Sequence, residues 1–95
     1  KLPSGKAAGV IANQMVRSGM SAGANYRAAC RARSRADFVS KMGIVEEELD
    51  ETLYWLDVSQ AAGFLSSQDI SGLEREGNEL LAIVVSSIRT ARRGM

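Results

Sequence analysis

The side chains in this chain that could do chemistry are arginines and carboxylates, and they gather in separate stretches. Residues 27–35 contain four arginines, and residues 46–51 contain five acids. The chain has no histidine, the commonest acid–base residue and metal ligand, so its single cysteine has no histidine to activate it. The sequence therefore predicts no catalytic residues, no cofactor and a protein that is not an enzyme.

The acidic stretch raises the question of a metal site. Glu46 and Asp50, like Glu47 and Glu51, stand four residues apart, so each pair projects from one side of a helix. Helical bundles that hold two metal ions combine such glutamates with Glu-x-x-His motifs on other helices. Because histidine is absent, we favour a solvated acidic face, or ion pairs to arginines, and predict no metal site.

The arginine-rich stretch favours recognition of phosphate, because a planar guanidinium group can donate two hydrogen bonds to phosphate oxygens. The arginines at 27, 31 and 35 are spaced four residues apart and would share one stripe on a continuous helix. The predicted nucleic-acid contacts, with two weaker members at the end, are Arg27, Arg31, Arg33, Arg35, Arg17 and Lys41. Alternatively, these arginines pair with the acids of the next helix. Both interpretations remain open on the sequence alone.

Charge is unevenly distributed along the chain, although the net charge is only +1. Residues 1–45 contain eight Lys and Arg and one acid, residues 46–79 contain ten acids and one arginine, and residues 80–95 contain three arginines. This asymmetry indicates either a polyanionic partner or the pairing of complementary faces. The first predicts a protein that binds RNA or DNA, or an accessory scaffold. The second predicts a protein–protein assembly module with no nucleic-acid role.

The length and composition predict one folded domain over residues 1–95. With 45% hydrophobic residues and a single proline, the chain is not of the disordered type. No apolar run approaches the roughly 18 residues of a membrane span, and no secretory signal pattern is visible. The single cysteine, Cys30, excludes an internal disulfide, and its alanine neighbours suggest a small packing residue. We expect a cytoplasmic protein that does not bind membranes.

Apolar residues recur at steps of three and four, which predicts helices and no strands. The expected helices span residues 4–32, 34–62 and 67–93. Gly19, Ser21 and Gly23 are weak helix formers, which allows a kink in the first helix near residues 19–23. We favour the alternative that these small residues let a neighbouring helix approach closely. Ser34 and either Ser66 or Ser67 are the expected N-caps, and Gly63 is the expected left-handed residue after the second helix.

The second and third expected helices carry clear apolar faces. The seam of the second helix consists of Phe38, Met42, Val45, Leu49, Thr52, Leu53 and Leu56. The inner face of the third consists of Ile70, Leu73, Gly77, Leu80, Leu81, Val84 and Ile88. Short connections make consecutive helices antiparallel neighbours, so we predict an all-α, antiparallel up-and-down helical bundle. Three helices give a thin core, which a fourth helix from a missing segment or another subunit would complete.

Four segments of the chain resemble a known family. They are Ser18-Gly-x-Ser-x-Gly-Ala-Asn25, Arg31-x-Arg-Ser34-x-x-Asp-Phe38, Glu47-Glu-x-Asp-Glu51-x-x-x-Trp-Leu56 and Ala61-Ala-Gly-Phe-Leu-Ser66. This pattern is similar to the four-helix-bundle proteins related to those encoded by intervening sequences of bacterial 23S ribosomal RNA genes. The likeness extends over nearly the whole chain.

The resemblance implies an antiparallel four-helix bundle that assembles into a homopentamer. It also implies kinship with the accessory protein of diversity-generating retroelements, a pentamer that binds nucleic acid and a reverse transcriptase. Two departures stand out. Relatives carry a helix before the stretch that begins at Lys1, so the resemblance implies that the family's first helix is missing here. Where ribosomal-intron members read Asn-Ile-Ala-Glu-Gly, this chain has Asn25-Tyr-Arg-Ala-Ala29, which indicates a more basic branch.

Overall fold

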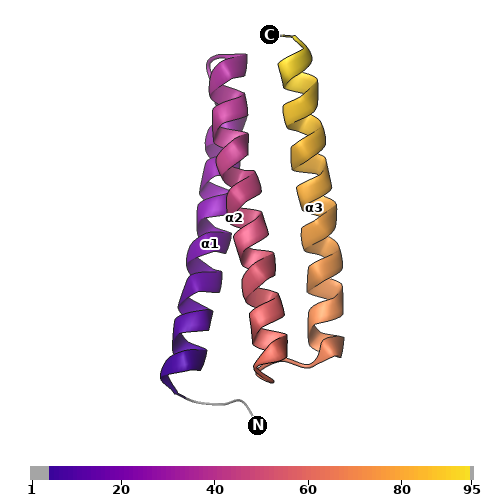
Figure 1. Ribbon diagram of the computed structural model, residues 1–95. Coiled ribbons are helices and arrows are strands. Elements are labelled where there is room, and N and C mark those ends of the chain that lie inside the picture. The colour runs from indigo at the N-terminus through magenta and orange to yellow at the C-terminus, as the bar shows by residue number, and fades with distance from the viewer. Residues whose placement is uncertain (1–4, 95) are drawn as a thin grey trace.

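The computed structural model describes residues 5–94, which form three long helices (Figure 1). They are α1 (Lys6–Cys30), α2 (Arg35–Ala61) and α3 (Ser67–Arg93). The expected start of the first helix at residue 4 lies outside the described residues. The all-α prediction is confirmed, since residues 5–94 contain helices and turns and no strand. None of the three helices is both long and apolar enough to span a membrane.

The middle helix organises the packing. α2 packs against both α1 and α3, and each neighbour runs antiparallel to it (Figure 1). No Cα atom of α1 lies within 8 Å of a Cα atom of α3. The result is an elongated body with Cα dimensions of 50 × 22 × 14 Å. α1 and α3 therefore flank α2 without closing over it.

Local hydrogen bonds begin α2 and α3 where the sequence predicts. The hydroxyl of Ser34 accepts a hydrogen bond from the backbone N–H of Asp37 at 3.0 Å. At α3 the full reciprocal capping box forms between Ser66 and Asp69, with bonds of 3.1 and 3.3 Å. Both caps satisfy amide groups that a helix start would otherwise leave without partners.

The end of α2 also follows its local sequence. Gly63 has φ +78°, a left-handed conformation that costs a glycine little. The backbone N–H of Phe64 then bonds to the carbonyl oxygen of Ser59 at 2.8 Å, as in a Schellman motif. The prediction of Gly63 as the terminating residue is confirmed, and α3 starts four residues later.

Small residues on α1 let it approach α2, but they are not the predicted ones. α1 is helical throughout residues 19–23, and Gly19 and Gly23 are exposed, with no atom within 4 Å of the place a Cβ would take. Ser18 and Ala22 face α2 instead, and the Ser18 hydroxyl lies 2.7 Å from that of Thr52. The close-approach role expected of the two glycines is therefore wrong. Each follows a contact residue by one position and is rotated by about 100° from it.

Buried apolar side chains run along this layer of helices, and Ile11, Leu56 and Ile70 are buried toward the end where α1 and α3 begin. One contiguous core cluster lies toward the other end. It combines two α1 alanines, two α2 residues and two α3 residues, namely Ala22, Ala29, Met42, Val45, Val84 and Ile88. Cys30 is exposed, so its interpretation as a packing residue is wrong. Its neighbour Ala29 occupies the buried position, because the α2-facing side of α1 passes through residues 18, 22 and 29.

One predicted core face remains partly uncovered. Leu73 and Leu80 on α3 each expose 51% of their surface, although the sequence places them on the inner face. They line a mainly apolar groove of about 260 Å³ between α2 and α3, together with Leu49, Thr52, Leu53, Leu56, Glu76 and Gly77. The described residues supply three helices rather than four, so no helix covers this groove.

Candidate nucleic-acid interface

Four of the six predicted contact residues lie at one end of the molecule. Arg27 belongs to the last turn of α1, Arg31 and Arg33 follow in the connection, and Arg35 is the first residue of α2. All four are exposed. The helix break between Cys30 and Arg35 means that they do not form the single helical stripe expected of Arg27, Arg31 and Arg35.

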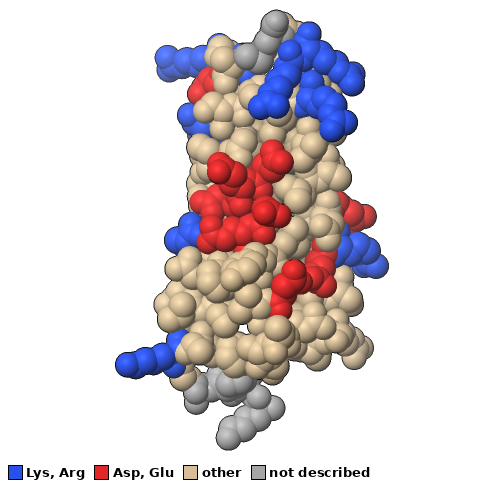
Figure 2. All heavy atoms as spheres, viewed as in Figure 1, with Lys and Arg blue, Asp and Glu red and all other residues tan. Residues whose placement is uncertain are grey.

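The fold brings a second group of arginines to the same end. Arg89, Arg92 and Arg93 lie in the final turns of α3 and are exposed. Figure 1 shows that this end of α3 and the α1–α2 connection are at the same end of the molecule, and Figure 2 shows lysine and arginine side chains gathered there. The guanidinium group of Arg35 donates a hydrogen bond to the carbonyl oxygen of Gly94, which joins the two segments.

We call this surface the basic end and define it as Arg27, Arg31, Arg33, Arg35, Arg89, Arg92 and Arg93. The three arginines of residues 80–95 were not among the contact residues predicted from the sequence, so their place beside the others was missed. The similar lengths of the expected helices could have predicted this arrangement. Antiparallel helices of 25, 27 and 27 residues bring the end of α1, the start of α2 and the end of α3 together.

No arginine of the basic end forms an ion pair with an acid of residues 5–94. The ion pairs in this part of the chain join Arg17 to Glu48 at 3.4 Å, Arg17 to Glu51, and Lys41 to Asp37 at 3.2 Å. Arg17 and Lys41 are thus the two predicted contact residues that have acidic partners. Of the remaining predicted arginines, Arg35 bonds to the carbonyl oxygen of Gly94, and Arg27, Arg31 and Arg33 are exposed without an acidic partner among residues 5–94.

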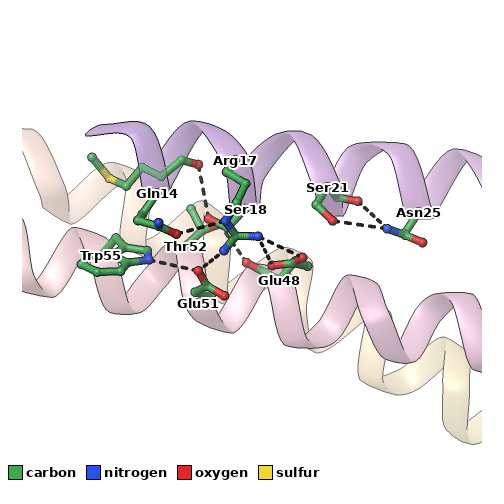
Figure 3. Close-up of polar contacts among 10 residues, drawn as sticks. Gln14, Arg17, Ser18, Ser21, Asn25, Glu48, Glu51, Thr52 and Trp55 are labelled. Carbon is green, nitrogen blue, oxygen red and sulfur yellow. Dashed lines mark hydrogen bonds and ion pairs between the residues drawn. The ribbon is translucent and has the colours of Figure 1, made fainter. Parts of the chain in front are cut away.

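Arg17 is part of a polar network between α1 and α2 (Figure 3). It donates to Gln14 at 3.0 Å and to Glu48 and Glu51 across the helix interface. The indole N–H of Trp55 donates to Glu51 at 3.2 Å. Hydrogen bonds from Trp55 and then from Arg17 lower the pKa of Glu51, and the bond to Glu51 raises the pKa of Arg17. Arg17 thus follows the alternative prediction, in which an arginine pairs with acids of the next helix.

Figure 2 shows acids gathered mainly over the middle of this face, below the basic end. Glu46 is an exception, since it shares a hollow with Arg89, Arg92 and Arg93. Among the described residues, no cluster of three or more acidic, cysteine or histidine side chains is suited to a metal ion. A hydrogen bond with Asp57 of α2 raises the pKa of Glu74 on α3, since two nearby carboxyl groups resist carrying two negative charges. The acidic side chains of residues 5–94 thus show no arrangement that is suited to binding a metal ion.

Comparison with known proteins then places the chain in a family. Residues 1–86 match the family described as 23S rRNA-intervening sequence protein. The chain belongs to this family. The resemblance carried by the four sequence segments is thereby confirmed.

A solved structure supports the same relationship. It is the crystal structure of a protein from the S23 ribosomal protein family of Bacteroides thetaiotaomicron, described as having unknown function. The two are 35% identical and superpose with a TM-score of 0.81, over 83% of this chain and 73% of that one. Comparison with curated proteins finds no match. Neither description points to an enzymatic activity.

Proposed function

We propose that this member of the family is a non-enzymatic protein that binds the phosphate backbone of RNA or DNA through its basic end. One observation carries the proposal. Seven exposed guanidinium groups from the ends of all three helices share one end of the molecule, and none is ion-paired with an acid of residues 5–94.

The chemistry of the basic end suits phosphate better than carboxylate partners within the fold. Guanidinium groups donate paired hydrogen bonds to phosphate oxygens and stay charged at any physiological pH. The nearby acid Asp37 is already engaged by Lys41 at 3.2 Å. Clustered, exposed arginines also attract a polyanion over distance, which speeds its association.

The test is the salt dependence of binding to fluorescently labelled RNA and DNA oligonucleotides, followed by fluorescence anisotropy. We expect binding at 50 mM salt, and a linear fall of the logarithm of the association constant with the logarithm of salt concentration. With four to seven phosphate contacts the slope should lie roughly between −3 and −6. A peptide nucleic acid of the same sequence, which has no phosphates, is the matched control and should not bind. Absence of binding at 50 mM salt would refute the proposal.

We also propose that the protein assembles with itself through the groove between α2 and α3. The supporting observation is the half-exposed leucine pair, Leu73 and Leu80, in an apolar groove that no helix of residues 5–94 covers. A helix from another subunit would remove these side chains from water and complete a four-helix arrangement. The resemblance to pentameric relatives makes a homopentamer the proposed assembly.

The assembly is tested by sedimentation velocity or light scattering of the purified chain. We expect a mass of about five times the 10.2 kDa of one chain. Leu73→Glu combined with Leu80→Glu should yield smaller species, because burying the new carboxylates against apolar side chains is costly. Tyr54→Glu is the matched control, since Tyr54 is 57% exposed and lies outside this groove. A monomeric wild-type protein at micromolar concentration would contradict the proposal.

A further inference from the structure

A hollow of about 420 Å³ opens beside the basic end, between α2 and α3. Its lining residues are Glu46 of α2 and Val85, Ile88, Arg89, Arg92 and Arg93 of α3. We call it the arginine cleft. Three of the seven arginines of the basic end line it, so nucleic acid held at that end would meet it directly.

The arginine cleft combines three kinds of chemistry within one small space. The arginines are exposed cations, and the half-buried Val85 presents aliphatic surface. Ile88 is only 6% exposed and belongs to the core cluster, so it adds little to that surface. Glu46 is a half-buried carboxylate that makes no ion pair with these arginines or with any other described residue. Its oxygens are therefore available to accept hydrogen bonds from a ligand.

We propose that the arginine cleft binds one unpaired nucleotide of a single-stranded nucleic acid. The flat, apolar face of a base would lie against Val85, and a guanidinium plane can stack on its other face. The remaining arginines bind the adjoining phosphates. The Glu46 carboxylate accepts hydrogen bonds from the edge of the base. This inference rests on the proposed nucleic-acid binding and specifies its substrate class.

The carboxylate makes the cleft selective both for single strands and for certain bases. In a duplex, the Watson–Crick edge of each base is already hydrogen-bonded and its faces are stacked, so a paired base cannot offer either to the cleft. Glu46 accepts hydrogen bonds but cannot donate them. It therefore favours cytosine, whose amino group projects a donor at that edge. Uracil presents a carbonyl oxygen in the same place, and its one donor, N3–H, lies between two carbonyl oxygens that repel a carboxylate.

Anisotropy titrations test this with three labelled RNAs of equal length, oligo-cytidine, oligo-uridine and a hairpin duplex. We expect wild-type protein to bind oligo-cytidine roughly 5- to 100-fold more tightly than oligo-uridine, the range typical of one well-made base contact. The duplex should bind more weakly than oligo-cytidine. Glu46→Gln should bring the two single strands to similar affinity, because the amide keeps one acceptor oxygen for the cytosine amino group and gains an NH2 group that can donate to the uracil carbonyl oxygen.

The matched control is Glu47→Gln, which removes the same charge from an exposed position outside the cleft. It should raise affinity for every probe about equally and leave the cytidine-to-uridine ratio unchanged. A second measurement uses free cytidine monophosphate and NMR. Shifts of the Val85 and Ile88 methyl signals are expected at low salt, and uridine monophosphate should cause smaller ones.

The outcomes separate this inference from the broader proposal. Equal binding of all three RNAs by the wild type, with normal salt dependence, would overturn the nucleotide site and leave backbone binding intact. A cytidine preference that survives Glu46→Gln would also overturn it. Failure of every probe to bind at low salt would remove both proposals together.

Discussion

Replacing Arg31, Arg33, Arg92 and Arg93 together with alanine is expected to weaken nucleic-acid binding roughly 10²- to 10³-fold at about 0.1 M salt. Each phosphate contact releases condensed counterions from the nucleic acid. Loss of four contacts should therefore also make the slope of the logarithm of the association constant against the logarithm of salt concentration shallower by about 3. All four residues are exposed and form no ion pair within residues 5–94. The substitutions should therefore leave the melting temperature nearly unchanged.

The design separates the two segments that make up the basic end. Arg31→Ala with Arg33→Ala changes only the α1–α2 connection, and Arg92→Ala with Arg93→Ala changes only the end of α3. If both segments contact one nucleic acid, each double variant weakens binding and the losses in binding free energy approximately add. If only one double variant has an effect, the basic end does not act as one surface.

The matched control removes charge of the same sign far from the basic end. Arg75 precedes Arg92 by 17 positions on α3, a distance of about 26 Å along the helix axis. Lys6 is the first residue of α1, whose last turn contains Arg27. Lys6→Ala combined with Arg75→Ala should lower affinity only slightly. Equal losses in the control and the fourfold variant would indicate a general charge effect and contradict a localised interface.

Met42→Ala is expected to lower the free energy of unfolding by about 2–5 kcal/mol. Met42 is 2% exposed and belongs to the core cluster to which all three helices contribute, with Ala22, Val45 and Val84 among its members. Truncation removes favourable burial and leaves a cavity. The surrounding layer is only three helices wide, and rigid helices cannot move far to fill the space.

The comparison variant is Met20→Ala, which makes the same chemical change on α1 where the methionine is 70% exposed. It should change the free energy of unfolding by no more than about 0.5 kcal/mol. Urea unfolding followed by circular dichroism measures both variants, and the midpoint should fall clearly only for Met42→Ala. Similar midpoints for the two variants would show that Met42 does not occupy a packed core.

The local sequence determined the helices of this protein and their ends. Apolar residues at steps of three and four predicted the helical segments, because side chains at those spacings share one face. Ser34, Ser66 and Gly63 marked the ends of helices, because caps and left-handed glycines act within three or four residues. The family resemblance likewise came from the order of residues and was confirmed by the match over residues 1–86.

The tertiary structure decided which charged groups face each other and which apolar groups stay uncovered. It paired Arg17 with Glu48 and Glu51, 31 and 34 positions away. It also brought Arg89, Arg92 and Arg93 to the end that carries Arg31 and Arg33, and it left Leu73 and Leu80 half exposed. These outcomes depend on the rotation of each helix about its axis and on which helices touch. Both the rotation of a helix and its choice of neighbours are determined by contacts between residues far apart in the sequence. The periodicity of a single helix therefore cannot show how completely its apolar face will be covered.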